Sequence, residues 1–236
     1  MFKTRSHKLE RIDTGDYTPE EYERFLREIR FINRFVGDVR ALRKTLLSEI
    51  EKADLQAFSV LDVGAGSGEL LRVIAKFARK QKRKANLFGL ELNARAAGAI
   101  LEESKNFDEI KSVRGDALNL PFADKSFDYA ICSLFTHHFT DDKVVEILSE
   151  MSRVSRRIIY VIDLHRNETA YRYYKIFCTV FRISPLVRED GSLSILRSFV
   201  PQELEKLGRE ANLIEISVTE HFPSRLVLQG SASQKV

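Results

Sequence analysis

The 236-residue sequence predicts an α/β fold in which a parallel sheet is wound by helices on both faces. Two observations lead to this prediction. Short apolar runs alternate with helical periodicities from Phe58 onward, and a glycine-rich turn separates the first such run from a helical segment. The composition is that of a globular protein, with 44% hydrophobic and 31% charged residues. At this length we expect one large domain with attachments rather than two domains.

Residues 1–57 are expected to form a helical layer of that same domain. The first fifteen or so residues are predicted to be loosely ordered. Thr18-Pro19-Glu20-Glu21 has the pattern of a capping box with proline in the first turn, and apolar residues at helical spacing follow it as far as Val36. Gly37-Asp38 is predicted to end this helix and to cap a second one that reaches Ile50.

Residues 58–236 are expected to form the ligand-binding part of the domain. We predict strands near 58–63, 86–91, 110–114, 127–132 and 157–162, and helices near 68–79, 94–104 and 141–154. The alternation then breaks, and residues 165–198 are predicted to be an insertion with a helix over 168–183 and a polar turn at 188–191. A helix from Pro201 and a hairpin of strands at 214–218 and 226–229, turning at Pro223-Ser224, would add one antiparallel strand.

The most informative motif is Gly64-Ala65-Gly66-Ser67-Gly68, which lies between the first strand and the first helix of the sheet. Glycine lets the backbone turn tightly and approach a ligand, and the N–H groups of the following helix attract an anionic group. The spacing differs from the dinucleotide fingerprint, and Asp62 would repel a pyrophosphate. The pattern therefore favours a ligand that has both an ammonium and a carboxylate group.

Two further acids follow the next two predicted strands. Glu91-Leu92 ends the second strand, twenty-three residues beyond Gly68, where an acid can accept hydrogen bonds from both hydroxyls of a ribose. Gly115-Asp116-Ala117 ends the third strand, where a carboxylate can accept an adenine amino proton while the next N–H meets a ring nitrogen. These two positions indicate a ligand that contains a nucleoside.

Across Val60–Met151 these motifs, together with Leu120-Pro121-Phe122 and Ser126-Phe127-Asp128, resemble the class I S-adenosylmethionine-dependent methyltransferases, in their quinone-biosynthesis and small-molecule branch. The resemblance implies a Rossmann-like sheet of order 3-2-1-4-5-7-6 with strand 7 antiparallel. Ile32-Asn33-Arg34 and Arg188–Arg197 more loosely resemble a bacterial subgroup found beside polyketide synthases. The cofactor contacts that the resemblance implies are Asp62, Gly64, Ala65, Gly66 and Gly68 for the methionine end, Glu91 with Leu92 for the ribose, and Asp116 with Ala117 for the adenine.

The segment Ser133-Leu134-Phe135-Thr136-His137-His138 follows the fourth predicted strand. The resemblance implies that Ser133 lies near the methionine portion and that His137 and His138 face the methyl group. Transfer would be an in-line displacement at the sulfonium, and a histidine is suited to remove the proton of an acceptor hydroxyl at neutral pH. Purely structural roles for both histidines, in capping the next helix or in packing under the loop, remain open.

Aromatic residues of the insertion are expected to form a lid. Tyr173, Phe177 and Phe181 recur at a spacing of four and would line one helix face over the strand ends, where they exclude water. A stripe that faces the core is an equally good interpretation. Docking on a membrane surface, with Arg172, Lys175 and Arg182 around the aromatic residues, is a third.

Charge and composition exclude other classes of protein. The net charge of +4 leaves nucleic acid as a partner, but the main basic cluster, Lys76–Lys84, ends the helix behind the glycine turn and is predicted to lie at the edge of the sheet opposite the ligand. The longest apolar run has five residues, so we expect a cytoplasmic protein. Cys132 and Cys178 are predicted to be buried, and no cluster has the spacing of a metal site.

The sequence therefore predicts an S-adenosylmethionine-dependent methyltransferase that acts on a small acceptor, such as a phenol, a quinol or a polyketide-like aromatic compound. An RNA methyltransferase is one alternative, although the segment after the fourth strand lacks the prolines and the catalytic cysteine common in such enzymes. A regulatory protein that binds the cofactor without turnover is another. Peripheral membrane contact and the oligomeric state are left open.

Overall fold

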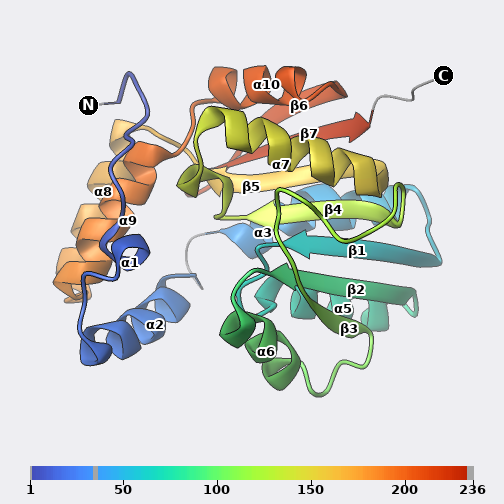
Figure 1. The fold of residues 1–236 in the computed structure, drawn as a ribbon, viewed down its shortest axis with the longest axis horizontal. Helices are drawn as coiled ribbons and strands as arrows, with labels where there is room; N and C mark the ends of the chain where they lie inside the picture. The colour runs from blue at the N-terminus through green and yellow to red at the C-terminus, as the bar shows by residue number, and fades with distance from the viewer. Residues whose placement is uncertain (1, 34–36, 233–236) are drawn as a thin grey trace.

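The computed structural model describes residues 2–33 and 37–232 and contains one seven-stranded sheet (Figure 1). The strand order is β3-β2-β1-β4-β5-β7-β6, which confirms the predicted order. β7 is antiparallel to both of its neighbours, whereas the other pairings are parallel. The strands are β1 (Ala57–Val63), β2 (Lys84–Glu91), β3 (Ile110–Arg114), β4 (Phe127–Ser133), β5 (Ser155–Leu164), β6 (Leu213–His221) and β7 (Arg225–Ala232).

Helices cover both faces of this sheet, as expected for a doubly wound fold. α7 (Asp141–Val154) and α10 (Pro201–Glu210) pack on one face, where Leu61 and Val63 of β1 join their apolar cluster. Val60 points to the other face of the sheet, into an apolar cluster formed with helices that precede and follow β1 in the sequence. The elements on that face are α3 (Asp38–Leu42), the π-helical turn η1 (Arg43–Leu47), α4 (Ser48–Lys52), α5 (Glu69–Lys80) and α6 (Ala94–Glu103). The single helix predicted up to Ile50 is thus interrupted by η1.

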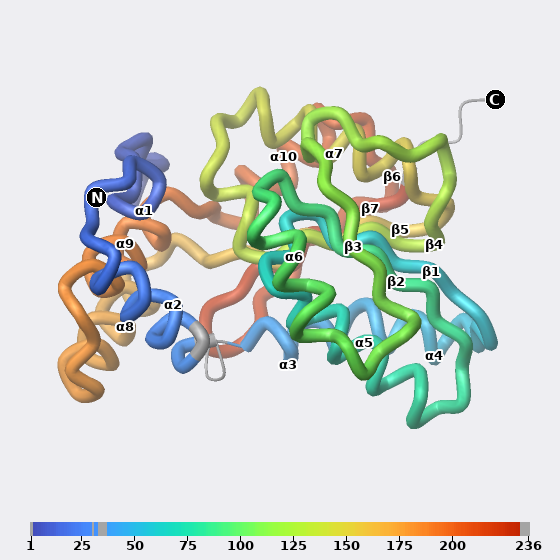
Figure 2. Tube along the Cα trace, turned by 60° about the horizontal axis from the view of Figure 1, so that its bottom comes forward, coloured from blue at the N-terminus to red at the C-terminus, as the bar shows by residue number. Residues whose placement is uncertain are grey.

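A third group of helices stands beyond the carboxyl ends of the parallel strands, on the left in Figures 1 and 2. It consists of α1 (Arg11–Thr14), α2 (Pro19–Asn33), α8 (Glu168–Val180) and α9 (Pro185–Arg197). α2 begins with the predicted capping box: the Thr18 N–H donates to Glu21 Oε2 at 2.9 Å, and the Glu21 N–H donates to Thr18 Oγ1 at 3.2 Å. The predicted continuation of this helix through Phe35 and Val36 lies outside the described residues.

The expectation of a loosely ordered N-terminus is wrong. Residues 2–16, here called the N-terminal arm, run along α9 and contain α1. The Arg5 side chain donates from Nε to the Arg197 carbonyl at 2.7 Å, and the N–H groups of Arg11 and Ile12 donate to Asp190 at 2.9 and 3.0 Å. These partners are 178 to 192 residues away along the chain, so no local pattern in the first fifteen residues could have revealed them.

The polar turn predicted at residues 188–191 is also wrong, because these residues lie inside α9. Gly191 allows the close approach of α8: a Cβ at this position would overlap the Tyr174 ring, whose hydroxyl donates to the Val187 carbonyl at 2.6 Å. Asp190 is buried as the acceptor for the N-terminal arm. The polar residues of this stretch are therefore partners of other elements and do not form a turn.

The hairpin at the end of the chain turns at Pro223-Ser224 between β6 and β7, as predicted. Among the helices that the structure describes, none combines the length and the apolar character needed to cross a bilayer.

Candidate functional site

The glycine turn joins β1 to α5 at the carboxyl edge of the sheet. Gly64, Gly66 and Gly68 have φ angles of +70°, +57° and +79°, a region that favours glycine. A Cβ at Gly64 would overlap the Phe135 ring, so this glycine lets the loop after β4 pack against the turn. A Cβ at Gly66 would meet nothing within 4 Å, so the backbone here borders open space. Ala65, between them, is partly buried against the apolar cluster that contains α5.

Asp62, two residues before this turn, is a buried acid without a partner. It is 3% exposed, and no donor from the residues that the structure describes bonds to its carboxylate. Burial, reinforced by repulsion from Glu91, raises the pKa of Asp62 well above its usual range. A buried charge without a counter-charge is unfavourable, so the site is suited to a ligand that brings an ammonium group.

Glu91 at the end of β2 turns toward the glycine turn. Its Oε1 accepts a hydrogen bond from the Gly66 N–H at 2.6 Å, and burial raises its pKa although this bond opposes the shift. Leu92, the next residue, is 64% exposed. The structure therefore brings together the glycine turn, Asp62 and Glu91, which are far apart in the sequence.

The third strand places Asp116 and Ala117 beside this group. The Gly115 N–H donates to the Glu91 carbonyl at 3.0 Å, which joins the ends of β2 and β3. Asp116 is exposed and accepts from the Leu118 N–H at 3.0 Å, whereas Ala117 is buried. The two residues thus follow Glu91 along the same edge of the sheet.

After Ser133, the half-buried last residue of β4, the chain turns into the short 3₁₀ helix η2 (Thr136–His138). Asp163 near the end of β5 organises η2: His137 Nδ1 lies 2.6 Å from Asp163 Oδ1, and the Thr136 hydroxyl donates to Oδ2 at 2.6 Å. Although burial would raise the pKa of Asp163, these partners lower it to about 2. His137 is itself buried and held in one orientation.

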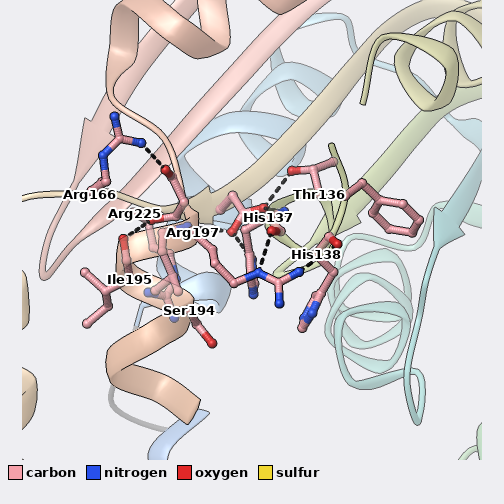
Figure 3. A network of polar contacts seen from close by, with 12 residues as sticks. Thr136, His137, His138, Arg166, Ser194, Ile195, Arg197 and Arg225 are labelled. Carbon is pink, nitrogen blue, oxygen red and sulfur yellow. Dashed lines mark hydrogen bonds and ion pairs between the residues drawn. The ribbon is translucent and has the colours of Figure 1, made fainter. Parts of the chain in front are cut away.

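The buried Arg197 of α9 contacts η2 (Figure 3) and also the N-terminal arm. It donates from Nη2 to the His138 carbonyl at 2.7 Å and from Nε to the His137 carbonyl at 3.3 Å. Its Nη1 lies 3.1 Å from Asp13 Oδ2, the same oxygen that lies 3.4 Å from His138 Nδ1. His138, whose side chain is 31% exposed, is therefore a residue of η2 whose side chain contacts the arm.

Sequence reasoning missed Asp163, Arg197 and Asp13 as parts of this site. Asp163 directly follows an apolar run in a predicted strand, so the rule that selected Asp62 and Glu91 at strand ends could have found it. Arg197 and Asp13 have no comparable signal, because they meet η2 only through the packing of α9 and the arm.

The three aromatic residues of the predicted lid do not form one group. The rings of Phe177 and Phe181 lie 4.4 Å apart, and Phe181 meets Phe31 of α2 at 5.5 Å. Tyr173 is 68% exposed. A cavity of about 660 Å³ lies between the N-terminal arm, α8 and α9, where its lining includes Arg5, Tyr171, Lys175 and Leu196 and no residue of the glycine turn.

The basic cluster lies where the sequence predicts it. Lys84 begins β2 and is therefore at the amino edge of the sheet, opposite the glycine turn. Arg79 pairs with Glu109 at 2.7 Å, and Arg83 donates to the Leu55 carbonyl. Two of the cluster's six basic residues are thus engaged within the molecule. Cys132 and Cys178 are buried, as expected.

Comparison with known sequences finds similarity to methyltransferases. A family model described as a methyltransferase domain matches residues 60–157. A probable tocopherol O-methyltransferase of Oryza sativa subsp. japonica is 32% identical over 123 residues, which are 50% of this chain and 32% of the rice protein. The demethylmenaquinone methyltransferase of Staphylococcus aureus is 25% identical over 175 residues, which cover 69% of this chain and 70% of that protein.

Solved structures agree in fold. Magnesium protoporphyrin IX methyltransferase from Synechocystis PCC 6803, with bound S-adenosylhomocysteine, aligns with a TM-score of 0.64 over 94% of this chain and 99% of its own, at 13% identity. The CurJ carbon methyltransferase aligns with a TM-score of 0.61 over 82% of this chain and 54% of its own, also at 13% identity. At such identities the likeness concerns the fold alone.

Proposed function

We infer that this chain, whose residues 60–157 belong to the methyltransferase domain family, is an S-adenosylmethionine-dependent methyltransferase. The observation that supports this most directly is the unpartnered, buried Asp62 beside the open backbone at Gly66. An amino acid moiety fits both features, because its ammonium can compensate Asp62 while its carboxylate can meet the N–H groups that begin α5, which have no acceptor within the helix.

The other cofactor contacts follow from the order of the strand ends. Glu91 accepts hydrogen bonds from the two ribose hydroxyls. Its hydrogen bond with the Gly66 N–H already directs its carboxylate toward the glycine turn. Asp116 and Ala117 hold the adenine through a carboxylate and a backbone N–H, and Leu92 lies against the nucleoside. Ser133 contacts the methionine portion. The bound cofactor supplies an electrophilic methyl group on its sulfonium.

We assign the acceptor to the class of small aromatic hydroxyl compounds: phenols, quinols or polyketide-like rings. Two curated relatives, named as acting on tocopherol and demethylmenaquinone, support this class. In this assignment residues 58–236 form the cofactor-binding part and 1–57 an accessory layer. Residues 165–198 form the insertion that covers the acceptor, with the apolar pair Phe177 and Phe181 joined to α2. Tyr173, exposed on the same helix, contacts an acceptor only when the insertion closes further.

We assign removal of the acceptor proton to a histidine of η2. His137 is buried and bound to Asp163, so its role is to position the turn. His138 is partly exposed and has Asp13 beside its Nδ1, so it can receive a proton on Nε2 from an acceptor hydroxyl. In-line alignment of the acceptor oxygen with the sulfonium supplies much of the remaining rate.

Calorimetric titration with S-adenosylmethionine, followed by a labelled-methyl screen of phenols, quinols and resorcinols, tests the proposal. We expect binding with one cofactor per chain and transfer to at least one aromatic hydroxyl. Binding without transfer to any of them would favour a regulatory role, and transfer to RNA alone would overturn the acceptor class. Absence of cofactor binding would refute the function itself.

A further inference from the structure

One cluster of potential metal ligands occurs among the residues that the structure describes. The side chains of Glu10, His137 and His138 each offer a ligand atom, and these atoms lie within 4.8 Å of one another. The two histidines belong to η2 and Glu10 to the N-terminal arm. The cluster therefore exists because the arm packs on η2.

Both imidazoles have a carboxylate behind them. His137 Nδ1 lies 2.6 Å from Asp163 Oδ1, and His138 Nδ1 lies 3.4 Å from Asp13 Oδ2. A carboxylate that accepts from Nδ1–H holds a neutral imidazole with the lone pair of Nε2 directed away from it, the arrangement found behind histidines that bind metal ions. Both Nε2 atoms are therefore the ones left to bind a ligand.

When both histidines are neutral, the negative charges around the cluster exceed the positive ones. Glu10 is buried, accepts from the Ser194 hydroxyl at 2.9 Å and lies 4.0 Å from Arg197 Nε. Arg197 also forms an ion pair with Asp13, with 3.1 Å between Nη1 and Oδ2. The nearby Arg5 pairs with Asp141 outside the cluster. The carboxylates of Glu10, Asp13 and Asp163 face the guanidinium of Arg197, while Arg5, which also acts on Asp163, is shared with Asp141. With both histidines neutral, this leaves an excess of negative charge that a divalent cation would reduce.

We propose that Glu10, His137 and His138 form a binding site for a divalent transition-metal ion, for which Zn²⁺ is the appropriate probe. Two imidazoles and one carboxylate are the ligand set of three-ligand zinc sites that keep a fourth position open. Ligands of tetrahedral zinc lie about 3.3 Å apart at bond lengths near 2.0–2.1 Å. The three side chains already offer ligand atoms within 4.8 Å of one another, and the partly exposed His138 can move to close the remaining distance.

The open position suits the hydroxyl oxygen of an acceptor, whose proton a bound cation makes easier to remove. This role depends on the proposed function, whereas binding of the ion does not. With the ion bound, Nε2 of His138 is a ligand and cannot act as the base. The acceptor proton would then pass to solvent water, the ion would stabilise the oxyanion that remains, and the histidines would hold the ion in place.

Calorimetric titration of Zn²⁺ into tag-free, EDTA-treated protein tests the site. We expect one ion per chain, with affinity reduced at least tenfold by Glu10→Gln and by His138→Ala. His221→Ala on β6 and Glu205→Gln on α10, which remove the same ligand types elsewhere, should leave the affinity within twofold of wild type. Circular dichroism of each variant shows whether it is folded. If His138→Ala does not fold, the isosteric Glu10→Gln decides.

Absence of stoichiometric binding by the wild type would overturn the metal site, as would unchanged affinity in both folded variants. A parallel titration with S-adenosylhomocysteine separates this result from the proposed function. Cofactor binding without zinc binding refutes the metal site alone, and zinc binding without cofactor binding refutes the methyltransferase alone.

Discussion

Replacement of Glu91 by alanine should weaken cofactor binding by about two orders of magnitude. In the proposed complex its carboxylate accepts two hydrogen bonds from the ribose, and bonds to a charged group each contribute about 1.5–3 kcal/mol. The Gly66 N–H at 2.6 Å uses one acceptor position, but a carboxylate has about four, so both ribose bonds remain possible. The lower limit is then about 3 kcal/mol, which corresponds to about a hundredfold in Kd.

One effect opposes this loss. Glu91 raises the pKa of Asp62 by repulsion, so its removal makes Asp62 easier to ionise and strengthens the contact with the cofactor ammonium. We therefore expect the measured loss to lie near the lower limit. Glu91→Gln keeps the shape and one acceptor oxygen but removes the charge. Its Kd for the cofactor should therefore lie between those of Glu91→Ala and the wild type.

Calorimetry with S-adenosylhomocysteine measures this loss without turnover. Glu102→Ala, near the end of α6, removes a carboxylate that is exposed to solvent and should leave Kd unchanged. If Glu91→Ala binds within threefold of wild type while Glu102→Ala does the same, Glu91 does not hold the ribose and the reasoning from strand ends fails.

Three other predictions concern the same edge of the sheet. Because the pKa of Asp62 is raised by burial and by Glu91, and only the ionised form attracts an ammonium, cofactor affinity should fall as the pH drops through this raised pKa, by at most about tenfold per pH unit. Asp62→Asn should remove this part of the pH dependence in calorimetry and leave the part that comes from Glu91, whose pKa is also raised by burial. Gly64→Ala should lower the stability by about 2–4 kcal/mol in thermal unfolding, since it combines a positive φ with overlap on Phe135, whereas Gly66→Ala should lower it by only about 1–2 kcal/mol; equal losses would contradict this account of the turn. His138→Ala should reduce turnover by about 10² or more while the Kd for S-adenosylhomocysteine stays within twofold, and full retained rate would leave His138 structural.

The sheet, and the candidate residues at its carboxyl edge, could be predicted because their signals are local. An apolar strand, a turn and an amphipathic helix each show in a few consecutive residues, and ligands meet parallel strands at their carboxyl ends. Asp62, Glu91 and Asp116 were identified in this way, and Asp163 could have been. The alternation itself was enough to place β1 to β5 within a few residues.

The N-terminal arm and α9 were not predicted because their partners are remote. Asp190 looks like a turn residue in the sequence, yet it is buried as the acceptor for the N–H groups of Arg11 and Ile12. Arg197 has no local signal of burial in the sequence, yet it is buried against η2. Buried polar residues that pair across more than 50 residues follow no periodic pattern in the sequence. The sequence around one member of such a pair therefore does not indicate the other.

The distance in sequence between the arm and α9 sets an order of assembly during synthesis. The arm is synthesised before α9, and Arg197, whose carbonyl accepts from the Arg5 side chain, follows Arg5 by 192 residues. Strands β1 to β5 also precede α9 along the chain. α1 has no buried residue, so its attachment depends on polar contacts that form only once α9 exists. The arm thus docks only after α9 has been made, and the surroundings of His138 are completed only at that step.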